Sequence, residues 1–272
     1  DMGVPLVRGK KFRFRGVNAL GLFFAVFSVT LILGVLLQFY LLPQILPALH
    51  WGHGLLKGGD WCGFHQEAVR VAHAIEIRGW QAWEPWPSCH WPAGAAAALY
   101  AFTGIHEPWV MLPVNGLLHA LGVTLFYILM RRLTGRPPVA LLATLPYLFF
   151  PSGAMIWGQI HKDIWMIPAV LLVMLSWVSL SALDRTTVPA ILRAWLFTLV
   201  ALPLLTLVRP YSVTLLFAGS FGAFLFLIGC AAWRKFRHRV DISRTWLTGA
   251  LGVLALFILA GYMPSGIPNM ER

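Results

Sequence analysis

The sequence predicts an all-α polytopic membrane protein with about seven transmembrane helices. Of its 272 residues, 58% are hydrophobic and only 11% are charged, which is less than half the charged fraction of typical soluble domains. The mean hydropathy is +0.73, and the apolar residues gather into runs long enough to cross a bilayer as helices. The basic residues behind the net charge of +11 lie between these runs. They therefore indicate membrane topology rather than a nucleic-acid interface.

Seven apolar runs divide the chain. A basic segment, residues 1–17, precedes the first run, which begins too late and is too long for a cleaved signal peptide, so we expect an uncleaved anchor. The membrane module then covers residues 18–263, and residues 264–272 form an outer C-terminal tail that we expect to be either truncated or continued in a longer protein. The predicted spans are residues 18–42, 109–131, 138–156, 164–183, 190–208, 211–233 and 246–263.

The distribution of charge predicts the orientation of these spans. With the N-terminus in the cytoplasm, fifteen of the 21 Lys and Arg residues lie on the cytoplasmic side, as expected from the excess of basic residues in cytoplasmic loops. Seven of the ten acidic residues then lie on the outer side. We therefore look for chemistry on the outer face, which holds residues 43–108 and 152–163.

The first outer loop, residues 43–108, is too rich in tryptophan for a solvated linker. Residues 64–79 predict an amphipathic helix lying flat on the membrane surface, and Trp91–Phe102 predicts a second helix with a proline in its first turn. The loop would then cover the outer ends of the spans, either as a lid over a site or as an interfacial belt without chemistry. The predicted apolar face of the first helix consists of Phe64, Ala68, Val71, Ala72 and Ile75.

Asp60 is the first candidate for catalysis. It follows Gly58 and Gly59, which allow a tight turn and the close approach of a substrate. A carboxylate at the edge of the bilayer could serve as a general base if partial desolvation raised its pKa. The alternative is a turn aspartate, or a helix N-cap ahead of Phe64.

A second group of ionisable residues, His161, Lys162 and Asp163, abuts the fourth span. Such residues are costly beside a membrane unless they are paired or hydrated. Asp163 is a candidate second acid that orients an acceptor or a metal ion, and Lys162 could hold a phosphate as a point charge. An interfacial Lys–Asp pair is the alternative. Arg209, just before Tyr211, lies outside against the positive-inside bias, which indicates an anionic partner: a lipid phosphate, or ordinary headgroups as the alternative.

Cysteines and histidines give weaker signals. Cys62 and Cys89 fall in the outer loop, where an oxidising compartment would permit a disulfide, and the sequence leaves this pairing open. No histidine spacing near them matches a zinc motif, so no metal ligand is assigned, and a divalent ion remains an open question. The histidines concerned are His50, His53, His65 and His90. His119 and Asn115, one turn apart, predict an interhelical contact. The span interiors otherwise hold almost no ionisable groups, which argues against an ion-coupled transporter.

Four ordered features resemble one enzyme superfamily. Together they are similar to the GT-C membrane glycosyltransferases, in the branch of protein mannosyltransferases and lipid A aminoarabinose transferases. The resemblance covers about residues 40–210. The features are Gly59-Asp60 with Phe64-His65, Trp91-Pro92-Ala93-Gly94 with Leu99-Tyr100, Asn115-Gly116-Leu117-Leu118 running to Arg131-Arg132, and Pro151-Ser152 with Lys162-Asp163.

The resemblance implies a site and a substrate. It implies a sugar donor on a polyprenyl phosphate, Asp60 as catalytic base, Asp163 as a second catalytic acid, and Lys162 or Arg209 at the lipid phosphate. The remaining residues that we assign to substrate binding are His65, His161 and Tyr211. The expected location is the inner or plasma membrane of a bacterium, with the active loops outside and no nucleic acid among the partners.

Two other functions compete with a glycosyltransferase. Family members usually carry further spans or a soluble C-terminal domain, so a chain that stops after seven spans could be a non-catalytic membrane subunit of a larger complex. The other competing function is a lipid or polyprenol transporter.

Overall fold

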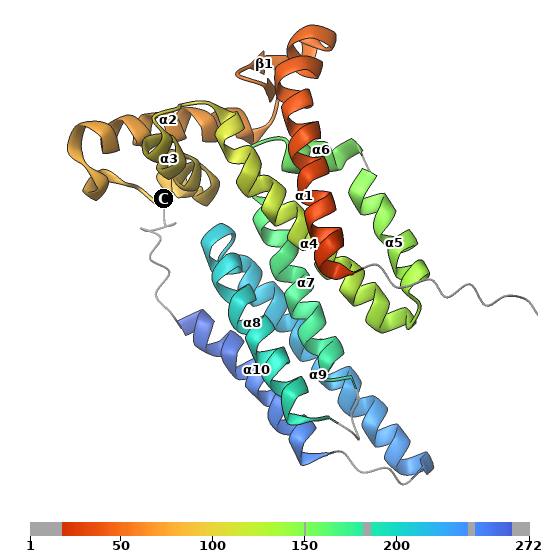
Figure 1. The fold of residues 1–272 in the computed structure, drawn as a ribbon. Coiled ribbons are helices and arrows are strands. Elements are labelled where there is room, and N and C mark those ends of the chain that lie inside the picture. Colours follow the sequence, from red (N-terminus) through yellow and green to blue (C-terminus); the bar gives the residue numbers. More distant parts are fainter. Residues whose placement is uncertain (1–17, 150, 182–185, 239–242, 263–272) are drawn as a thin grey trace, which may run out of the picture.

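The computed structural model describes residues 18–149, 151–181, 186–238 and 243–262, and within them the chain is all-α apart from one small hairpin. Most of the α-helices form a bundle, and two helices, α2 (Asp60–Arg78) and α3 (Trp91–Thr103), lie across one end of it (Figure 1). The bundle helices are α1 (Ala19–Leu36), α4 (Leu112–Thr134), α5 (Pro137–Phe149), α7 (Asp163–Ser179), α8 (Val188–Val208), α9 (Tyr211–His238) and α10 (Arg244–Tyr262). The predicted N-terminal segment 1–17 and the tail 264–272 lie outside the described residues.

Among the described residues, five helices are long and apolar enough to cross a membrane. They agree with five of the predicted spans and support an integral membrane protein. The five are Ala19–Ile45, Pro108–Thr134, Val188–Val208, Tyr211–Trp233 and Arg244–Gly261. Two further apolar helices, Pro137–Leu148 and Asp163–Ser179, are shorter, so the predicted number of seven spans is not confirmed.

Among the described residues, the bundle is held by one apolar cluster between α4, α7, α8, α9 and α10 and a second between α1, α4 and α5. Helix α4 packs against α1, α5 and α7, α7 packs against α8, and α10 packs against both α8 and α9. Buried polar side chains fasten these contacts: Ser176 donates a hydrogen bond to the carbonyl of Ala194 at 2.7 Å, and Trp246 donates to that of Leu180 at 2.7 Å. Helices α1 and α9 expose large apolar side chains such as Phe24 and Phe226, as expected of surfaces that face lipid.

The predicted span 138–156 is not one continuous helix. The structure replaces it with two short helices, α5 and α6 (Pro151–Trp157), which run in different directions (Figure 1). A proline at position 151 has no backbone N–H to continue the hydrogen bonding of α5, and it disfavours helical geometry at the preceding residue. Residues 138–156 are apolar, as predicted, but they do not form one helix.

The first span ends in a π-helical segment, Leu37–Ile45, that contains Pro43. The N–H of Leu46 donates to the carbonyl of Leu41 at 2.8 Å, which is a spacing of five residues rather than four. Such a widened turn is a usual response to a residue that cannot donate a backbone hydrogen bond. It leaves Gln38 buried at the end of the span that faces α6 and the hairpin.

The segment after the first span contains a hairpin that the sequence did not predict. Strands β1 (His50–Gly52) and β2 (Leu55–Leu56) pair antiparallel, and a positive φ of 53° at His53 and 73° at Gly54 forms the turn between them. Helix α2 (Asp60–Arg78) follows. It begins four residues before the predicted start at residue 64, so Asp60 is its first residue, with Gly59 as the N-cap.

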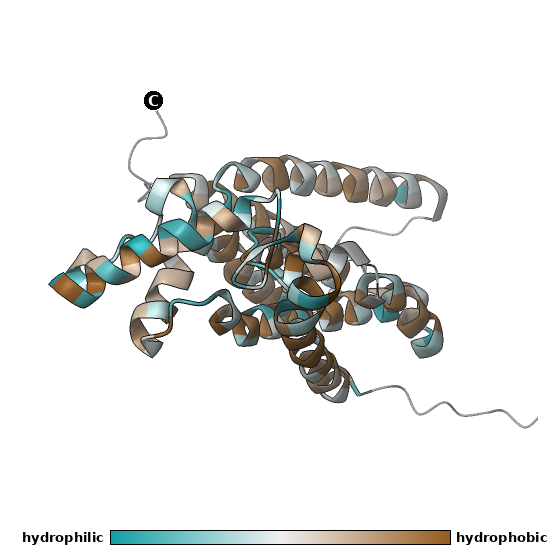
Figure 2. Ribbon diagram, turned by 90° about the horizontal axis from the view of Figure 1, so that it is seen from above, coloured by the Kyte–Doolittle hydropathy of each residue, from teal (hydrophilic) through white to brown (hydrophobic). Residues whose placement is uncertain are grey.

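Helices α2 and α3 (Trp91–Thr103) pack against each other and form their own core. All five residues of the predicted apolar face of α2 are buried. The small side chains of α3, Ala93, Ala96 and Ala97, are fully buried and permit this close approach. The apolar face of α2 is therefore covered by α3, and the expectation that it rests on lipid is wrong. Polar residues line the other side of α2, as seen from above in Figure 2.

Gly94 provides a test of how closely α3 packs against the loop that precedes it. A Cβ added there would lie 2.0 Å from the carbonyl oxygen of Pro85, so Gly94→Ala forces two backbones apart. We expect a loss of about 1–3 kcal/mol in the free energy of unfolding. Gly63→Ala in α2, where a Cβ would meet no atom within 4 Å, is the matched control and should stabilise the helix by about 0.5–1 kcal/mol. Thermal unfolding in detergent micelles measures both, and equal stability of the two variants would contradict the packing described.

Candidate functional site

Asp60 lies at the N-terminus of α2 and forms an ion pair with a residue 102 positions away. Its Oδ2 accepts a hydrogen bond from Nζ of Lys162 at 3.0 Å. The Asp60 side chain is 64% exposed, whereas that of Lys162 is 30% exposed. Sequence reasoning named both residues, and the structure brings them into direct contact.

A second ion pair begins at the next residue of the chain. Asp163, the first residue of α7, lies 2.7 Å through Oδ1 from Nη2 of Arg209, which stands between α8 and α9. The consecutive residues Lys162 and Asp163 thus connect α2 on one side with the α8–α9 junction on the other. Four of the seven residues predicted for the site form this cluster, which we call the charge quartet: Asp60, Lys162, Asp163 and Arg209.

Three buried amide side chains hold residues 157–159, the segment that leads to Lys162 and Asp163 of the quartet. Gln38 donates to the carbonyl of Gly158 at 2.7 Å. Asn115 donates to the carbonyls of Trp157 and Gln159 at 3.1 and 2.8 Å. The Gln159 side chain accepts from the N–H of Leu56 at 3.1 Å and so joins the hairpin to the same segment. These bonds replace the helical ones that end at Trp157, and buried carbonyls require such partners. We call this group the amide clamp.

The electrostatic environment of Asp60 differs from the prediction. The hydrogen bond from Lys162, followed by the charge of Lys162, holds the pKa of Asp60 below its ordinary value of 3.8, and the slight burial of the group opposes this only weakly. The sequence argument expected desolvation to raise this pKa. It was wrong because the carboxylate is exposed and meets a cation first.

A cavity of about 530 Å³ opens beside Asp60. Its wall includes His90, whose ring packs 4.8 Å from that of Phe64 and whose pKa is lowered by burial and then by the charge of Lys162. Ser88 and Cys89 beside it adopt positive φ angles of 50° and 66°, a costly conformation for residues with a side chain. The lining residues are Gly59, Asp60, Gly63, Phe64, Gln66, Glu67, Ser88 and His90.

His161 belongs to this region, as predicted. The backbone N–H of Asp163 donates to its Nδ1 at 3.1 Å, and its ring lies 5.9 Å from that of Trp61. Burial lowers the pKa of His161, while the charge of Asp163 opposes the change. The ring therefore caps the start of α7 and links it to α2.

The structure does not bring His65 or Tyr211 into contact with the quartet. His65 is buried between α2 and α3 with 4% exposure, its Nδ1 lies 3.0 Å from the hydroxyl of Tyr100, and burial lowers its pKa to about 4. Tyr211 begins α9 with 56% exposure. The first is a core histidine and the second a surface residue in the structure.

The disulfide between Cys62 and Cys89, which the sequence left open, is not formed in the structure. Cys62 and Cys89 are separate free thiols, and Cys62 donates to the carbonyl of Leu56 at 3.3 Å. Within the described part of the chain, the side chains close enough to share a metal ion are instead His73, Glu76 and His106, which the sequence analysis did not consider. His119, as predicted, makes an interhelical contact, with its ring 5.3 Å from that of Tyr147.

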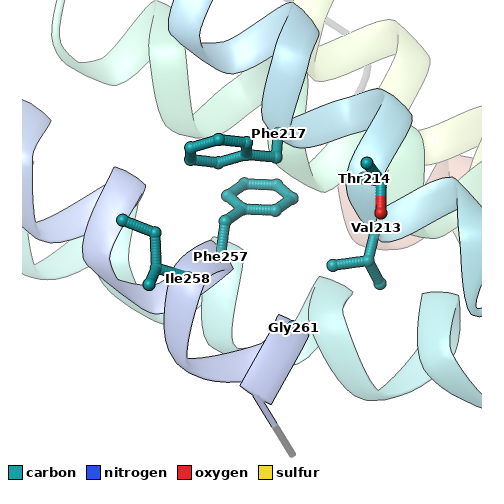
Figure 3. Close-up of a pocket in the computed structure, with 6 residues that line it drawn as sticks. All are labelled: Val213, Thr214, Phe217, Phe257, Ile258 and Gly261. Atoms are coloured by element: carbon teal, nitrogen blue, oxygen red, sulfur yellow. The ribbon is translucent and has the colours of Figure 1, made fainter.

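An apolar cavity of about 300 Å³ lies between α9 and α10 (Figure 3). The ring centroids of Phe217 and Phe257 lie 6.4 Å apart at its wall. The lining also includes Val213, four residues after Arg209. Near the same junction, the indole N–H of Trp86 donates to the carbonyl of Leu207 at 2.9 Å. The loop before α3 is thus fastened to the end of α8, beside the quartet.

Comparisons with models of known protein families, with curated proteins and with solved structures find no match for this chain.

The hydrogen bonds of the amide clamp can be tested by substitution. Asn115→Ala removes the donor for two buried carbonyls, which should lower the free energy of unfolding by about 1–3 kcal/mol. Thr124→Ala, in the same helix, is the control. The Thr124 hydroxyl is also buried but has no hydrogen-bond partner among the described residues, so its loss should cost less. Unfolding in detergent measures both changes, and an equal loss in the two variants would show that Asn115 does not hold the segment.

The Asp60–Lys162 pair makes a second prediction, on pH. Because the pKa of Asp60 in the folded protein lies below 3.8, the pair stabilises the fold above that pH, and its contribution is lost as the pH falls through the folded pKa. A double-mutant cycle of Asp60→Asn and Lys162→Gln should give a coupling of at most about 1 kcal/mol at pH 6, because the carboxylate is exposed. The coupling should vanish below the folded pKa, and a coupling that grew on acidification would contradict the pair.

Proposed function

We propose that this protein is a membrane glycosyltransferase of the GT-C type. It would move a sugar from a polyprenyl-phosphate donor to an acceptor hydroxyl at the face that carries α2 and α3. The observation that carries the proposal is the charge quartet, in which two carboxylates and two cations from three parts of the chain meet beside a cavity. The resemblance in motif order over residues 40–210 is the second support.

The topology belongs to the same proposal. We take α5 with α6, and α7, as the two further membrane segments beside the five long helices, which gives the seven spans of the GT-C module. The charge distribution supports an N-terminus in the cytoplasm, and the quartet would then lie on the outer face. A bacterial inner membrane would supply the polyprenyl-phosphate donor.

The two cations of the quartet suit the phosphate of the donor. Lys162 is adjacent in sequence to Asp163, the partner of Arg209, and each cation is already held by a carboxylate, at 3.0 Å for Lys162 and 2.7 Å for Arg209. A donor phosphate would take over these contacts and stabilise the charge that develops as polyprenyl phosphate leaves. The apolar cavity between α9 and α10 would receive part of the isoprenoid chain.

Donor binding would also change Asp60. The lowered pKa of this carboxylate makes it a weak base while Lys162 is bound to it. Once Lys162 turned to the phosphate, the pKa of Asp60 would rise towards its ordinary value. Asp60 would then take the proton of the acceptor hydroxyl, whose oxygen bonds to the anomeric carbon as the bond from that carbon to the phosphate oxygen breaks. Asp163 would hold Arg209 and the acceptor in place.

One observation favours a non-catalytic subunit instead. Both cations of the quartet are neutralised by carboxylates of the same chain, and structural ion-pair networks also shift pKa values. In that case the quartet fastens α2 to the bundle, and a partner chain in the membrane carries the chemistry.

Replacement of Asp60 separates these functions. The purified protein in nanodiscs would be given mannosyl or aminoarabinosyl polyprenyl phosphate, with cell membranes as the source of acceptor, and release of polyprenyl phosphate would be measured. We expect Asp60→Asn to reduce transfer by about 10²–10⁴-fold. Glu84→Gln is the control, because Glu84 is an exposed carboxylate of the same layer that pairs with Arg70 at 2.8 Å, away from the cavity lining; transfer should be unchanged.

Two results would contradict the proposal. Transfer at the wild-type rate by a folded Asp60→Asn protein would remove Asp60 as the base. Transfer that needs a second membrane protein, and that survives Asp60→Asn in its presence, would support the non-catalytic subunit.

A further inference from the structure

A second cluster of chemically reactive side chains lies at the far end of α2 from Asp60. His73 and Glu76 are three residues apart and share one face of the helix. His106 lies in the segment after α3, two residues beyond Gly104, whose φ angle of 67° is in the left-handed region. Glu76 lies sixteen residues beyond Asp60, or roughly 24 Å along the helix. The cluster is therefore separate from the charge quartet.

The three side chains already converge on one carboxylate. Nδ1 of His73 lies 3.1 Å from Oε2 of Glu76, and Nε2 of His106 lies 2.7 Å from Oε1. The two imidazole rings are 4.5 Å apart in an edge-to-face arrangement. One ligand atom from each residue lies within 4.8 Å of the other two.

We propose that His73, Glu76 and His106 form a zinc site. Two imidazole nitrogens and one carboxylate oxygen are a common ligand set for Zn²⁺, with bond lengths of about 2.0–2.2 Å and water in the fourth position. Tetrahedral geometry at such lengths separates the ligand atoms by about 3.3 Å. Here one ligand atom from each residue lies within 4.8 Å of the others, and the ring nitrogens lie 2.7 and 3.1 Å from the two different oxygens of Glu76.

Small movements would complete the coordination. The side chains of His73, Glu76 and His106 are 57%, 37% and 22% exposed, so each has room to turn towards a metal ion. The exposure also leaves the ion accessible from solvent.

The site joins two elements that are distant in sequence. His106 lies thirty residues after Glu76, and the ion would fasten the C-terminal end of α2 to the segment that leaves α3. Zinc at this point would stabilise the α2–α3 layer, whose other end carries Asp60. It would do so whether or not the protein transfers sugars, because none of the three residues lines the cavity at Asp60.

Zinc titration tests the site directly. The full chain would be purified with an affinity tag that contains no histidine, stripped with EDTA, and titrated with Zn²⁺ at pH 7.5 against a zinc-binding dye. We expect one saturable equivalent. His73→Ala and His106→Ala should each weaken binding at least about tenfold, the effect of losing some 1.4 kcal/mol. Zinc should raise the unfolding temperature of the wild type but not of these variants.

His53→Ala is the matched control. His53 is an exposed histidine of the same layer that pairs with Glu107 at 3.0 Å, and it should bind zinc as the wild type does. Unfolding of every variant without zinc shows that it is folded. Equal affinity in the wild type and His106→Ala, or zinc binding without saturation, would overturn the site.

Discussion

The need to satisfy buried backbone groups shapes the part of the molecule on which the candidate site depends. After Trp157 the chain leaves helical geometry while it is still inside the protein, and its carbonyls lose their helical donors. An unpaired carbonyl in such a place costs more than an ordinary hydrogen bond contributes. The amide clamp of Gln38, Asn115 and Gln159 supplies the missing partners from the first span, from α4 and from the segment itself. This arrangement sets the direction in which the chain continues to His161, Lys162 and Asp163.

Much of the bundle could be predicted from the sequence because apolar runs of membrane length have few alternative structures. Five long helices agree with predicted spans, and the amphipathic pattern of α2 marked all five residues of its buried face. Composition could not show where a run is broken. The segment 138–156 is apolar like the others, and its prolines do not distinguish it, because the unbroken helices α7 and α8 contain Pro168 and Pro203. Nor could periodicity show what covers an apolar face: the face of α2 suits lipid and protein equally, and α3 occupies it.

The candidate site was predictable in part, because ionisable residues beside apolar runs are few and costly. This signal marked Asp60, Lys162, Asp163 and Arg209, but a single sequence holds no record of contact between positions 102 residues apart. The direction of the pKa shift at Asp60 depended on that unseen contact. The amide clamp was missed because glutamine and asparagine are ordinary residues until their surroundings are known. The contact of His65 with Tyr100 was missed for the same reason, since the two residues lie 35 positions apart.

The two ion pairs of the quartet have a consequence for how an anion could reach the site. Two carboxylates and two cations at contact distance cancel in formal charge, and the field of such a group fades within a short distance, further weakened by salt. The quartet therefore exerts little long-range attraction on phosphates dissolved in water, unlike a cleft of one sign. Under the proposed function, a phosphate that carries a lipid tail would differ, because the bilayer would confine it to two dimensions and deliver it beside α7 and α9 without electrostatic steering. Selection between free and lipid-borne anions can thus be made before any contact with the protein.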